Sequence, residues 1–354
     1  MATAPLWRIN GRPGGFLRAD PYDLPTVSAA PTYDLPPEAI AQAPVEPRDA
    51  ARLLVDGDPV RHLHVRDLPS LLRPGDVVVL NETRVIPARL HLRKPTGGAV
   101  EVLLVEERAD GAWTALVKPS RKVPPGTVLE AGPDLAVELG DALPDGQRLV
   151  RLRTDDVAAA LDRHGEVPLP PYLTGGIDDP ERYQTVYAAV PGSVAAPTAG
   201  LHLTPEVLDR CRSAGAEVVH VDLQVGLGTF KPVTADRLED HEVHEERYSV
   251  PEPTMAACER AERVVAIGTT TVRALETAAA TGELQGRSRL LITPGHEWRV
   301  VDALLTNFHL PRSTLLLLVE ALVGERWRDL YRLALDEGYR FLSFGDAMFL
   351  ERSR

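Results

Sequence analysis

Residues Gly192 to Glu206 read GSVAAPTAGLHLTPE, a stretch rich in small residues with a single carboxylate at its end. Thr204-Pro205-Glu206 has the features that begin a helix: a hydroxyl N-cap, a proline in the first turn and an early acid. The glycines and alanines before it let the backbone approach another group closely. The stretch therefore predicts a tight loop leading into a helix, either as a ligand-binding loop or as a packed connection.

Downstream of Thr204, strand-like and helix-like segments alternate. Helical patterns cover residues 205–214, 254–261, 272–280, 314–323 and 326–336, and apolar strand patterns cover 216–223, 264–267 and 290–292. Alternation of this kind is typical of an α/β layer with a mostly parallel sheet. Upstream, Asp76-Val-Val-Val-Leu80 has the pattern of a further buried strand, and residues 37–43 that of a short helix.

Between residues 86 and 154 the hydrophobic period changes to two. Leu90 and Leu92 alternate with charged residues, Gly97-Gly98 signals a hairpin, and several short strand patterns follow. We therefore expect an α/β body, residues 32–85 plus 155–354, interrupted by a small inserted antiparallel β-barrel domain at 86–154. Residues 1–31 are rich in Pro, Ala and Gly without periodicity, and are predicted to be disordered.

Charge and hydropathy narrow the class of protein. The formal net charge is −12, which argues against a general polyanion binder. Residues 81–125 nevertheless carry eight basic and five acidic side chains, either a local face that meets phosphate or a solvated sheet face. No apolar run approaches the roughly 20 residues of a membrane helix, and no secretory signal is evident. Cys211 and Cys258 form no CxxC pair, so we expect a cytoplasmic protein with reduced thiols.

Three loops share one design: Gly192–Thr204, Gln224–Pro232 (QVGLGTFKP) and Gly268–Arg273 (GTTTVR). Each offers small residues and backbone amides at the predicted carboxyl end of a strand or at a helix start, the usual ligand side of an α/β sheet. The helix that opens after Thr271 suits a carboxylate or phosphate. The glycines form neither a GxGxxG fingerprint nor a P-loop, which argues against a dinucleotide oxidoreductase and an ordinary NTPase.

Two polar segments require separate interpretation. HEVHEE at residues 241–246 is compatible with a metal site, an ion-paired segment or a substrate contact, but it is not HExxH and no cysteine pair accompanies it, so we expect no metal. TNFHLPRST at 306–314 lies between a strand and a helix that Ser313 can cap. Asn307 and His309 are then available either for a cleft or for local backbone groups.

Seven ordered segments resemble one known family. They are residues 33–55, 81–88, 192–204, 225–233, 268–276, 306–319 and 339–348. Together they are similar to the S-adenosylmethionine:tRNA ribosyltransferase-isomerase family of queuosine biosynthesis, from about residue 32 to the end. TNFHLPRSTLLLL (306–318) and GSVAAPTAGLH (192–202) are the most specific runs.

The resemblance implies an unusual use of S-adenosylmethionine. Its ribosyl moiety is transferred and isomerised onto the aminomethyl-7-deazaguanine (preQ1) base of tRNA, which gives epoxyqueuosine-tRNA and releases adenine and methionine. It also implies an α/β domain with an inserted β-barrel, S-adenosylmethionine as substrate, no metal and tRNA as partner. We expect a monomeric transferase without a membrane partner.

The implied chemistry assigns roles to particular residues. A base must remove a hydrogen next to the sulfonium and a proton donor must assist adenine departure. His202 is the first choice for proton transfer and His309 the second, with Glu166 as the carboxylate alternative. Asp302 is predicted to bind ribose hydroxyls, and Arg273 the methionine carboxylate or a phosphate.

Further contacts are expected in the three loops and on the basic segment. The other predicted substrate-binding residues are Thr198, Gly200, Gly226, Gly228, Thr229, Gly268, Thr269 and Asn307. The predicted tRNA-binding residues are Arg84, Arg89, Lys118, Arg121 and Lys122.

The chain departs from the family pattern at three places. Leu203 and Gln224 stand where members usually carry Phe and His, and His296-Glu297-Trp298 replaces a usual Tyr-x-Phe. Gln224 removes a titratable group. Two alternatives therefore stay open: a family paralogue that uses S-adenosylmethionine on a different acceptor, and a non-catalytic RNA-binding relative.

Overall fold

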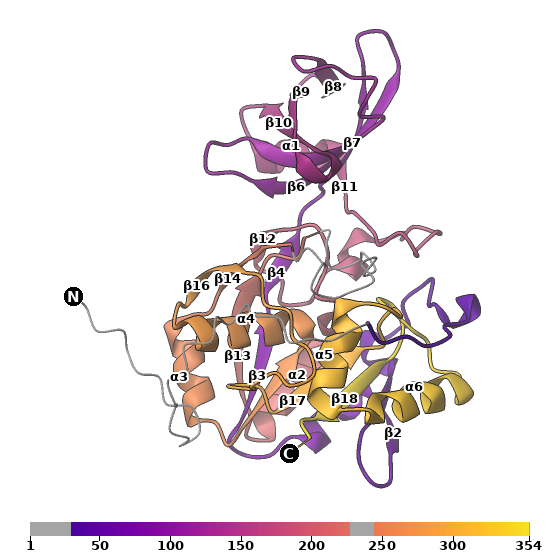
Figure 1. Ribbon diagram of the computed structural model, residues 1–354, viewed down its shortest axis with the longest axis vertical. Helices are drawn as coiled ribbons and strands as arrows, with labels where there is room; N and C mark the ends of the chain where they lie inside the picture. The colour runs from indigo at the N-terminus through magenta and orange to yellow at the C-terminus, as the bar shows by residue number, and fades with distance from the viewer. Residues whose placement is uncertain (1–29, 227–243, 354) are drawn as a thin grey trace, which may run out of the picture.

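The computed structural model describes residues 30–226 and 244–353, and Figure 1 shows a large body with a smaller barrel at one end of its long axis. Of the segment predicted to be disordered, residues 1–29 lie outside the described residues. No helix in the described part of the chain is long and apolar enough to cross a membrane.

The body is built on a nine-stranded sheet. In order across the sheet the strands are β16 (Gln285–Ser288), β14 (Glu246–Ser249), β13 (Glu217–Leu223), β3 (Asp76–Asn81), β15 (Arg263–Ile267), β17 (Ala303–Asn307), β18 (Ala347–Glu351), β1 (Arg52–Val55) and β2 (Arg61–His64). Neighbours are parallel from β13 through β17 and between β18 and β1, and antiparallel in the other four pairs. The sheet is therefore mixed, with a parallel centre, and not mostly parallel as predicted.

The central strand β3 is buried along its whole length. Val77 and Val79 join the core on one face of the sheet, and Val78 and Leu80 join the core on the other, as the period of two requires. A strand covered on both faces needs a continuous apolar run, which explains why Asp76-Val-Val-Val-Leu80 was recognisable from sequence.

Helices cover both faces of this sheet. α3 (Glu252–Arg260), α4 (Thr269–Thr281), α5 (Thr314–Val323) and α6 (Arg326–Asp336) share one core, and α2 (Pro205–Ser213) and the 3-10 helix η3 (Val65–Leu71) share the other. α2 begins as predicted, because the Thr204 hydroxyl accepts the Val207 amide at 3.3 Å.

The smaller part is a closed antiparallel barrel, as predicted. Its strands, in spatial order, are β5 (Arg89–Arg93), β6 (Ala99–Glu107), β7 (Trp113–Lys118), β10 (Gln147–Arg153), β9 (Leu135–Ala142) and β8 (Val128–Gly132). Pairing of Arg93 with Glu130 closes the barrel. α1 (Val157–His164) packs against its core, and the two-residue strand β11 (Gly165–Glu166) pairs with the start of β5.

Short elements join the two parts. β4 (Thr83–Val85) and β12 (Val190–Ser193) form a parallel ribbon below the barrel in Figure 1. The remaining 3-10 helices are η1 (Pro37–Ala39), η2 (Arg48–Ala50), η4 (Pro144–Gly146), η5 (Pro180–Tyr183) and η6 (Thr198–His202).

Two predicted elements were wrong. The helix expected at 37–43 is only the single turn η1, because Ile40 already has extended dihedrals. The strand expected at 290–292 is absent, and the edge strand is β16, made of the polar residues QGRS. Leu290 and Ile292 alternate like strand residues, but they are buried by the core around α4 and not by a sheet.

Candidate active site

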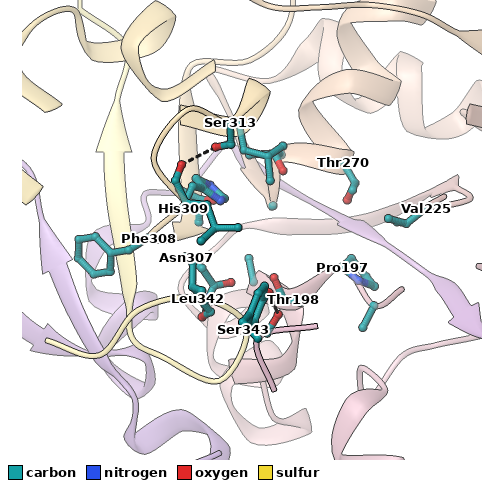
Figure 2. Close-up of a pocket in the computed structure, with 18 residues that line it drawn as sticks. Pro197, Thr198, Val225, Thr270, Asn307, Phe308, His309, Ser313, Leu342 and Ser343 are labelled. Atoms are coloured by element: carbon teal, nitrogen blue, oxygen red, sulfur yellow. Dashed lines mark hydrogen bonds between the residues drawn. The ribbon is translucent and has the colours of Figure 1, made fainter. Parts of the chain in front are cut away.

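A cavity of about 630 Å³ lies where all three predicted loops meet. The carboxyl ends of β15 and β17 lead into it, and η6 and Val225 complete its wall. Figure 2 shows its labelled side chains arranged around a central hollow. Its polar lining residues are Tyr172, Thr198, Thr269, Thr270, Thr306, Asn307, His309, Ser313 and Ser343.

The N-terminus of α4 forms one side of this cavity. Gly268, between β15 and α4, has φ 88° and ψ 153°, a conformation open almost only to glycine. No side chain caps the helix, and Thr269 and Thr270 of its first turn line the cavity. The first amides of a helix carry unpaired N–H groups and a partial positive charge, so this side suits an anionic group.

The N-terminus of α5 forms a second side. The Ser313 hydroxyl accepts the Leu316 amide at 3.2 Å and donates to the Leu310 carbonyl at 2.7 Å, the dashed bond in Figure 2. The predicted cap is thus confirmed, and it holds the turn after His309 at the cavity edge. Two helix N-termini and several hydroxyls therefore surround one apolar hollow.

His309 lines the cavity as a buried neutral imidazole. Its Nε2 lies 2.8 Å from the Thr306 hydroxyl, and its backbone amide donates to the Tyr331 hydroxyl at 3.0 Å. Burial lowers the pKa of His309 to about 3. At neutral pH the ring is uncharged, with one N–H that can donate a hydrogen bond and one nitrogen that can accept one.

His202 lies behind the cavity wall and is not among its lining residues. Its Nε2 is 2.9 Å from the Nδ2 of Asn307, which does line the cavity. The same Nδ2 lies 3.1 Å from the Leu342 carbonyl and 3.3 Å from that of Asp346. Carbonyls only accept, so the nitrogen of the amide faces this side, and His202 accepts a hydrogen bond from it.

The surroundings of His202 keep it uncharged. Burial, followed by the positive charges of Arg340, Arg182 and Arg48, lowers its pKa to about 3. The residue chosen first for proton transfer is therefore a neutral hydrogen-bond acceptor one layer behind the cavity surface.

Two predicted carboxylates lie elsewhere. Glu166 is exposed on β11 at the barrel edge, 3.2 Å from His91. Asp302 stands at the start of β17 and Asn307 at its end, so about 16 Å of extended strand separates them. Asp302 accepts the Val264 amide and pairs with Arg352, both at 3.0 Å. Neither Glu166 nor Asp302 lines this cavity, because Asp302 precedes β17 and β11 pairs with the barrel strand β5. A contact of either carboxylate with substrate stays a prediction.

Other predicted contacts divide into two groups. Thr198, Gly268, Thr269 and Asn307 line the cavity, and their contact with substrate stays a prediction. Gly200 serves packing, since a Cβ there would overlap the Tyr187 hydroxyl.

Arg273 and Gly226 share a partner outside this cavity. Arg273 is ion-paired with the buried carboxylate of Glu246, whose other oxygen accepts the Gly226 amide at 3.1 Å. Gly228 and Thr229 lie outside the described residues.

Sequence reasoning missed the hydroxyl pair formed by Tyr172 and Ser343, whose oxygens lie 2.7 Å apart in the cavity wall. Burial raises the pKa of Tyr172 to about 12. Tyr172 ends the proline-rich run VPLPPY, and Ser343 lies between Phe341 and Phe344, which have the pattern of core residues. A polar residue at the end of a stiff segment was the only available signal.

A second cavity of about 910 Å³ lies between barrel and body. The barrel contributes Glu106, Thr114 and Gln147, and the body contributes Gln224 and Val225 among others. Val225 lines both cavities. The Gln224 side chain packs on Gly192, where a Cβ would lie 2.6 Å from its Nε2.

Ion pairs join the two parts beside this second cavity. Arg247 lies 3.2 Å from Glu106, and Arg287 pairs with the same carboxylate. Arg247 also donates to the Glu107 carbonyl at 3.1 Å. The start of β14 and the edge strand β16 thus hold the end of β6.

The predicted tRNA-binding residues lie in two places. Arg84 is on β4, 2.6 Å from Glu181, and Arg89 is half-buried at the start of β5. Lys118, Arg121 and Lys122 are exposed around the end of β7. By the register of β6 with β7, this is the barrel end away from Glu107 and the body.

Across residues 30–226 and 244–353 there is no group of three or more His, Cys, Asp and Glu side chains able to hold a metal. Of the HEVHEE segment, residues 241–243 lie outside the described part; Glu245 and Glu246 pair with arginines.

The chain is similar in sequence to known proteins of one family. A family model described as queuosine biosynthesis protein matches residues 29–350. A relative from Rubrobacter xylanophilus is 56% identical over 322 residues, with 90% of this chain and 96% of the relative covered. One from Thermus thermophilus is 56% identical over 339 residues, with 90% and 97% covered. Both are named S-adenosylmethionine:tRNA ribosyltransferase-isomerase.

A solved structure is also similar. The crystal structure of S-adenosylmethionine tRNA ribosyltransferase from Thermotoga maritima is 39% identical, with a TM-score of 0.51 and coverage of 90% of this chain and 98% of that one. The fold of this chain is therefore similar to that of a protein named as a tRNA ribosyltransferase. The chain belongs to the queuosine biosynthesis protein family.

Proposed function

We propose that this protein is an S-adenosylmethionine:tRNA ribosyltransferase-isomerase. It transfers and isomerises the ribosyl moiety of S-adenosylmethionine onto the preQ1 base of tRNA, giving epoxyqueuosine-tRNA and releasing adenine and methionine. The observation that carries the proposal is the cavity in which three separate loops meet at the N-termini of α4 and α5. It acts as a cytoplasmic monomer without a metal.

S-adenosylmethionine occupies the first cavity in this proposal. The open first turn of α4 receives the methionine carboxylate through backbone amides, because Arg273 is already paired with Glu246. The hydroxyls of Thr198 and Ser343 line the same space and bind ribose. His309 is an imidazole that lines the cavity, so we assign to it the proton removed next to the sulfonium.

The acceptor base occupies the second cavity. It lies between barrel and body and shares the lining residue Val225 with the first cavity. Gln147 and Gln224 line it with side-chain amides that can read the edge of a base. A base turned out of an anticodon loop is recognised in this manner. Lys118, Arg121 and Lys122 bind phosphates of the same tRNA.

One observation favours a second candidate, a paralogue that modifies another acceptor. Gln224 stands where the family usually carries histidine, and it lines the cavity assigned to the acceptor. A non-catalytic RNA-binding relative is less well supported, because His309 and Asn307 both line the first cavity.

Adenine release tests the proposal. The protein is incubated with S-adenosylmethionine and tRNA that carries preQ1, and adenine is followed by chromatography. The same tRNA with guanine at that position is the control. Release that depends on preQ1 supports the proposal. Adenine release that requires a different acceptor, and does not occur with preQ1, establishes the paralogue. S-adenosylmethionine binding without any adenine release establishes a non-catalytic relative.

A further inference from the structure

Asn307 carries a buried acceptor atom without a partner. The residue is 2% exposed and lines the first cavity, yet no described residue donates a hydrogen bond to its Oδ1. Leaving a buried acceptor unpaired is unfavourable, and native proteins rarely do so without a reason. Beside a cavity, the simplest reason is a donor on the cavity's ligand.

The amide of Asn307 cannot turn over to relieve this. Its Nδ2 lies near the carbonyls of Leu342 and Asp346 and the Nε2 of His202. Exchanging Nδ2 with Oδ1 would put an acceptor against both carbonyls. Three acceptors on one side thus hold the amide with its nitrogen inward and its oxygen on the other side.

We propose that His202 is a positioning residue that holds the Asn307 amide so that its Oδ1 accepts a hydrogen bond from an N–H or O–H group of S-adenosylmethionine. The inference rests on the proposed function, since it concerns the ligand of the first cavity. His202 itself touches no ligand, because it lies behind Asn307 and outside the cavity lining.

This role requires an acceptor at Nε2 and does not require a titratable group. The charged groups that face His202 are Arg340, Arg182 and Arg48, all of which disfavour a second proton on the ring. A protonated ring would turn Nε2 into a donor and oppose the Asn307 Nδ2. His202 is therefore suited to hold a neighbour and unsuited to donate a proton.

Isosteric substitutions separate positioning from proton transfer. In His202→Gln, the side-chain oxygen can reach the position of Nε2 and accept from Asn307, but it cannot titrate. In His202→Asn, the shorter side chain reaches only the position of Nδ1 and leaves Asn307 without this acceptor. Asn307→Ala removes the Oδ1 acceptor itself.

The test measures S-adenosylmethionine binding by calorimetry and turnover from pH 6 to 9, on full-length protein whose folding is checked by circular dichroism. We expect His202→Gln to bind within about threefold of wild type and to keep its turnover and pH profile. We expect His202→Asn and Asn307→Ala to weaken binding about tenfold, as the loss of one hydrogen bond predicts. If Asn307→Ala is not recovered folded, Asn307→Ser replaces it, because the serine hydroxyl can still donate to the carbonyls.

Three outcomes overturn the inference. Normal binding by His202→Gln with turnover reduced more than a hundredfold would make His202 a proton-transfer residue. Unchanged binding by the Asn307 variant would show that Oδ1 does not contact the ligand. Wild-type protein that binds no S-adenosylmethionine would remove the proposed function as well, whereas the first two outcomes leave that function standing.

Discussion

The guanidinium of Arg273 on α4 is paired with the carboxylate of Glu246 on β14, and the two side chains are only 14% and 4% exposed. Glu246 also accepts the Gly226 amide, so the pair ties the α4 helix to the loop after β13. A charge that binds a buried partner is not available for substrate. The ion pair therefore gives Arg273 a structural role, which is to attach α4 to this loop.

Breaking this pair should destabilise the protein strongly. Arg273→Met leaves the Glu246 carboxylate buried without its cation, and we expect a loss of about 3–5 kcal/mol in the free energy of unfolding. The double variant Arg273→Met/Glu246→Met should recover much of that loss, because no uncompensated charge is left. Urea denaturation of both single variants and the double variant gives the coupling. If the Arg273→Met variant is as stable as wild type but binds S-adenosylmethionine more weakly, Arg273 contacts the substrate and the structural role is contradicted.

Gly268 and Gly282 flank α4 and make a matched pair. Gly268→Ala forces alanine into φ 88°, ψ 153° at the cavity, and we expect a loss of about 1–3 kcal/mol together with weaker S-adenosylmethionine binding. Gly282→Ala at the other end has φ 78°, ψ 2° and open space, so it should lose about 1 kcal/mol and bind normally. Thermal unfolding and calorimetry measure both effects. Equal binding by the two variants would contradict a ligand role for the α4 N-terminus.

The buried histidines predict a specific acid sensitivity. The pKa values of His202 and His309 are about 3 in the folded protein, below the unfolded value of about 6.5. Their contribution to stability is therefore complete above pH 6.5 and is lost as the pH falls from 6.5 toward 3, because only the unfolded chain takes up the protons.

Unfolding free energies from pH 4.5 to 7 measure this slope. His202→Gln should lower the slope of unfolding free energy against pH by the contribution of one proton, about 1.4 kcal/mol per pH unit. The control is Val186→Ala, which changes an exposed residue without a titratable group and should leave the slope as it is in wild type. An unchanged slope in His202→Gln would contradict a neutral buried imidazole.

The basic end of the barrel predicts a change in salt dependence. Replacing Lys118, Arg121 and Lys122 by alanine should weaken tRNA binding and lower the slope of log K against log salt by about 2–3, since each phosphate contact contributes about 0.7–0.9. S-adenosylmethionine binding should not change. Arg210→Ala on α2, an exposed cation on the body, is the control. A slope equal to that of wild type would move the tRNA contact away from this end of the barrel.

Periodicity was informative where burial is regular. The barrel and the parallel centre of the sheet could be predicted, because Leu90 and Leu92 alternate into one core and β3 is apolar on both faces. The antiparallel edges could not, because β14 and β16 are short and polar (ERYS and QGRS) and pair through backbone groups that any residue supplies. The bounds of β17 were not evident from the pattern either, so Asp302 could not be assigned to the start of a strand that ends at Asn307.

The candidate site shows the same division. Loops with glycine and hydroxyl residues could be assigned to the cavity from sequence, since their composition reflects close backbone approach. Which side chains lie at the cavity surface and which lie behind it could not be predicted from sequence. Sequence assigned His202 and Asn307 to one site, but only three-dimensional packing puts Asn307 at the surface of the cavity and His202 behind it. Tyr172 and Ser343 meet over 171 positions of chain, a separation that no local pattern records.

The pairing of Arg89 with Glu166 and of Leu90 with Gly165 joins the points where the chain enters and leaves the barrel. Paired residues in an antiparallel ladder lie about 5 Å apart, a gap that a two-residue turn can span. The chain thus enters and leaves the barrel at one place, and no strand of the barrel belongs to the nine-stranded sheet. The order of strands in the body is therefore independent of the inserted domain, which contacts the body further through Glu106 and Glu107.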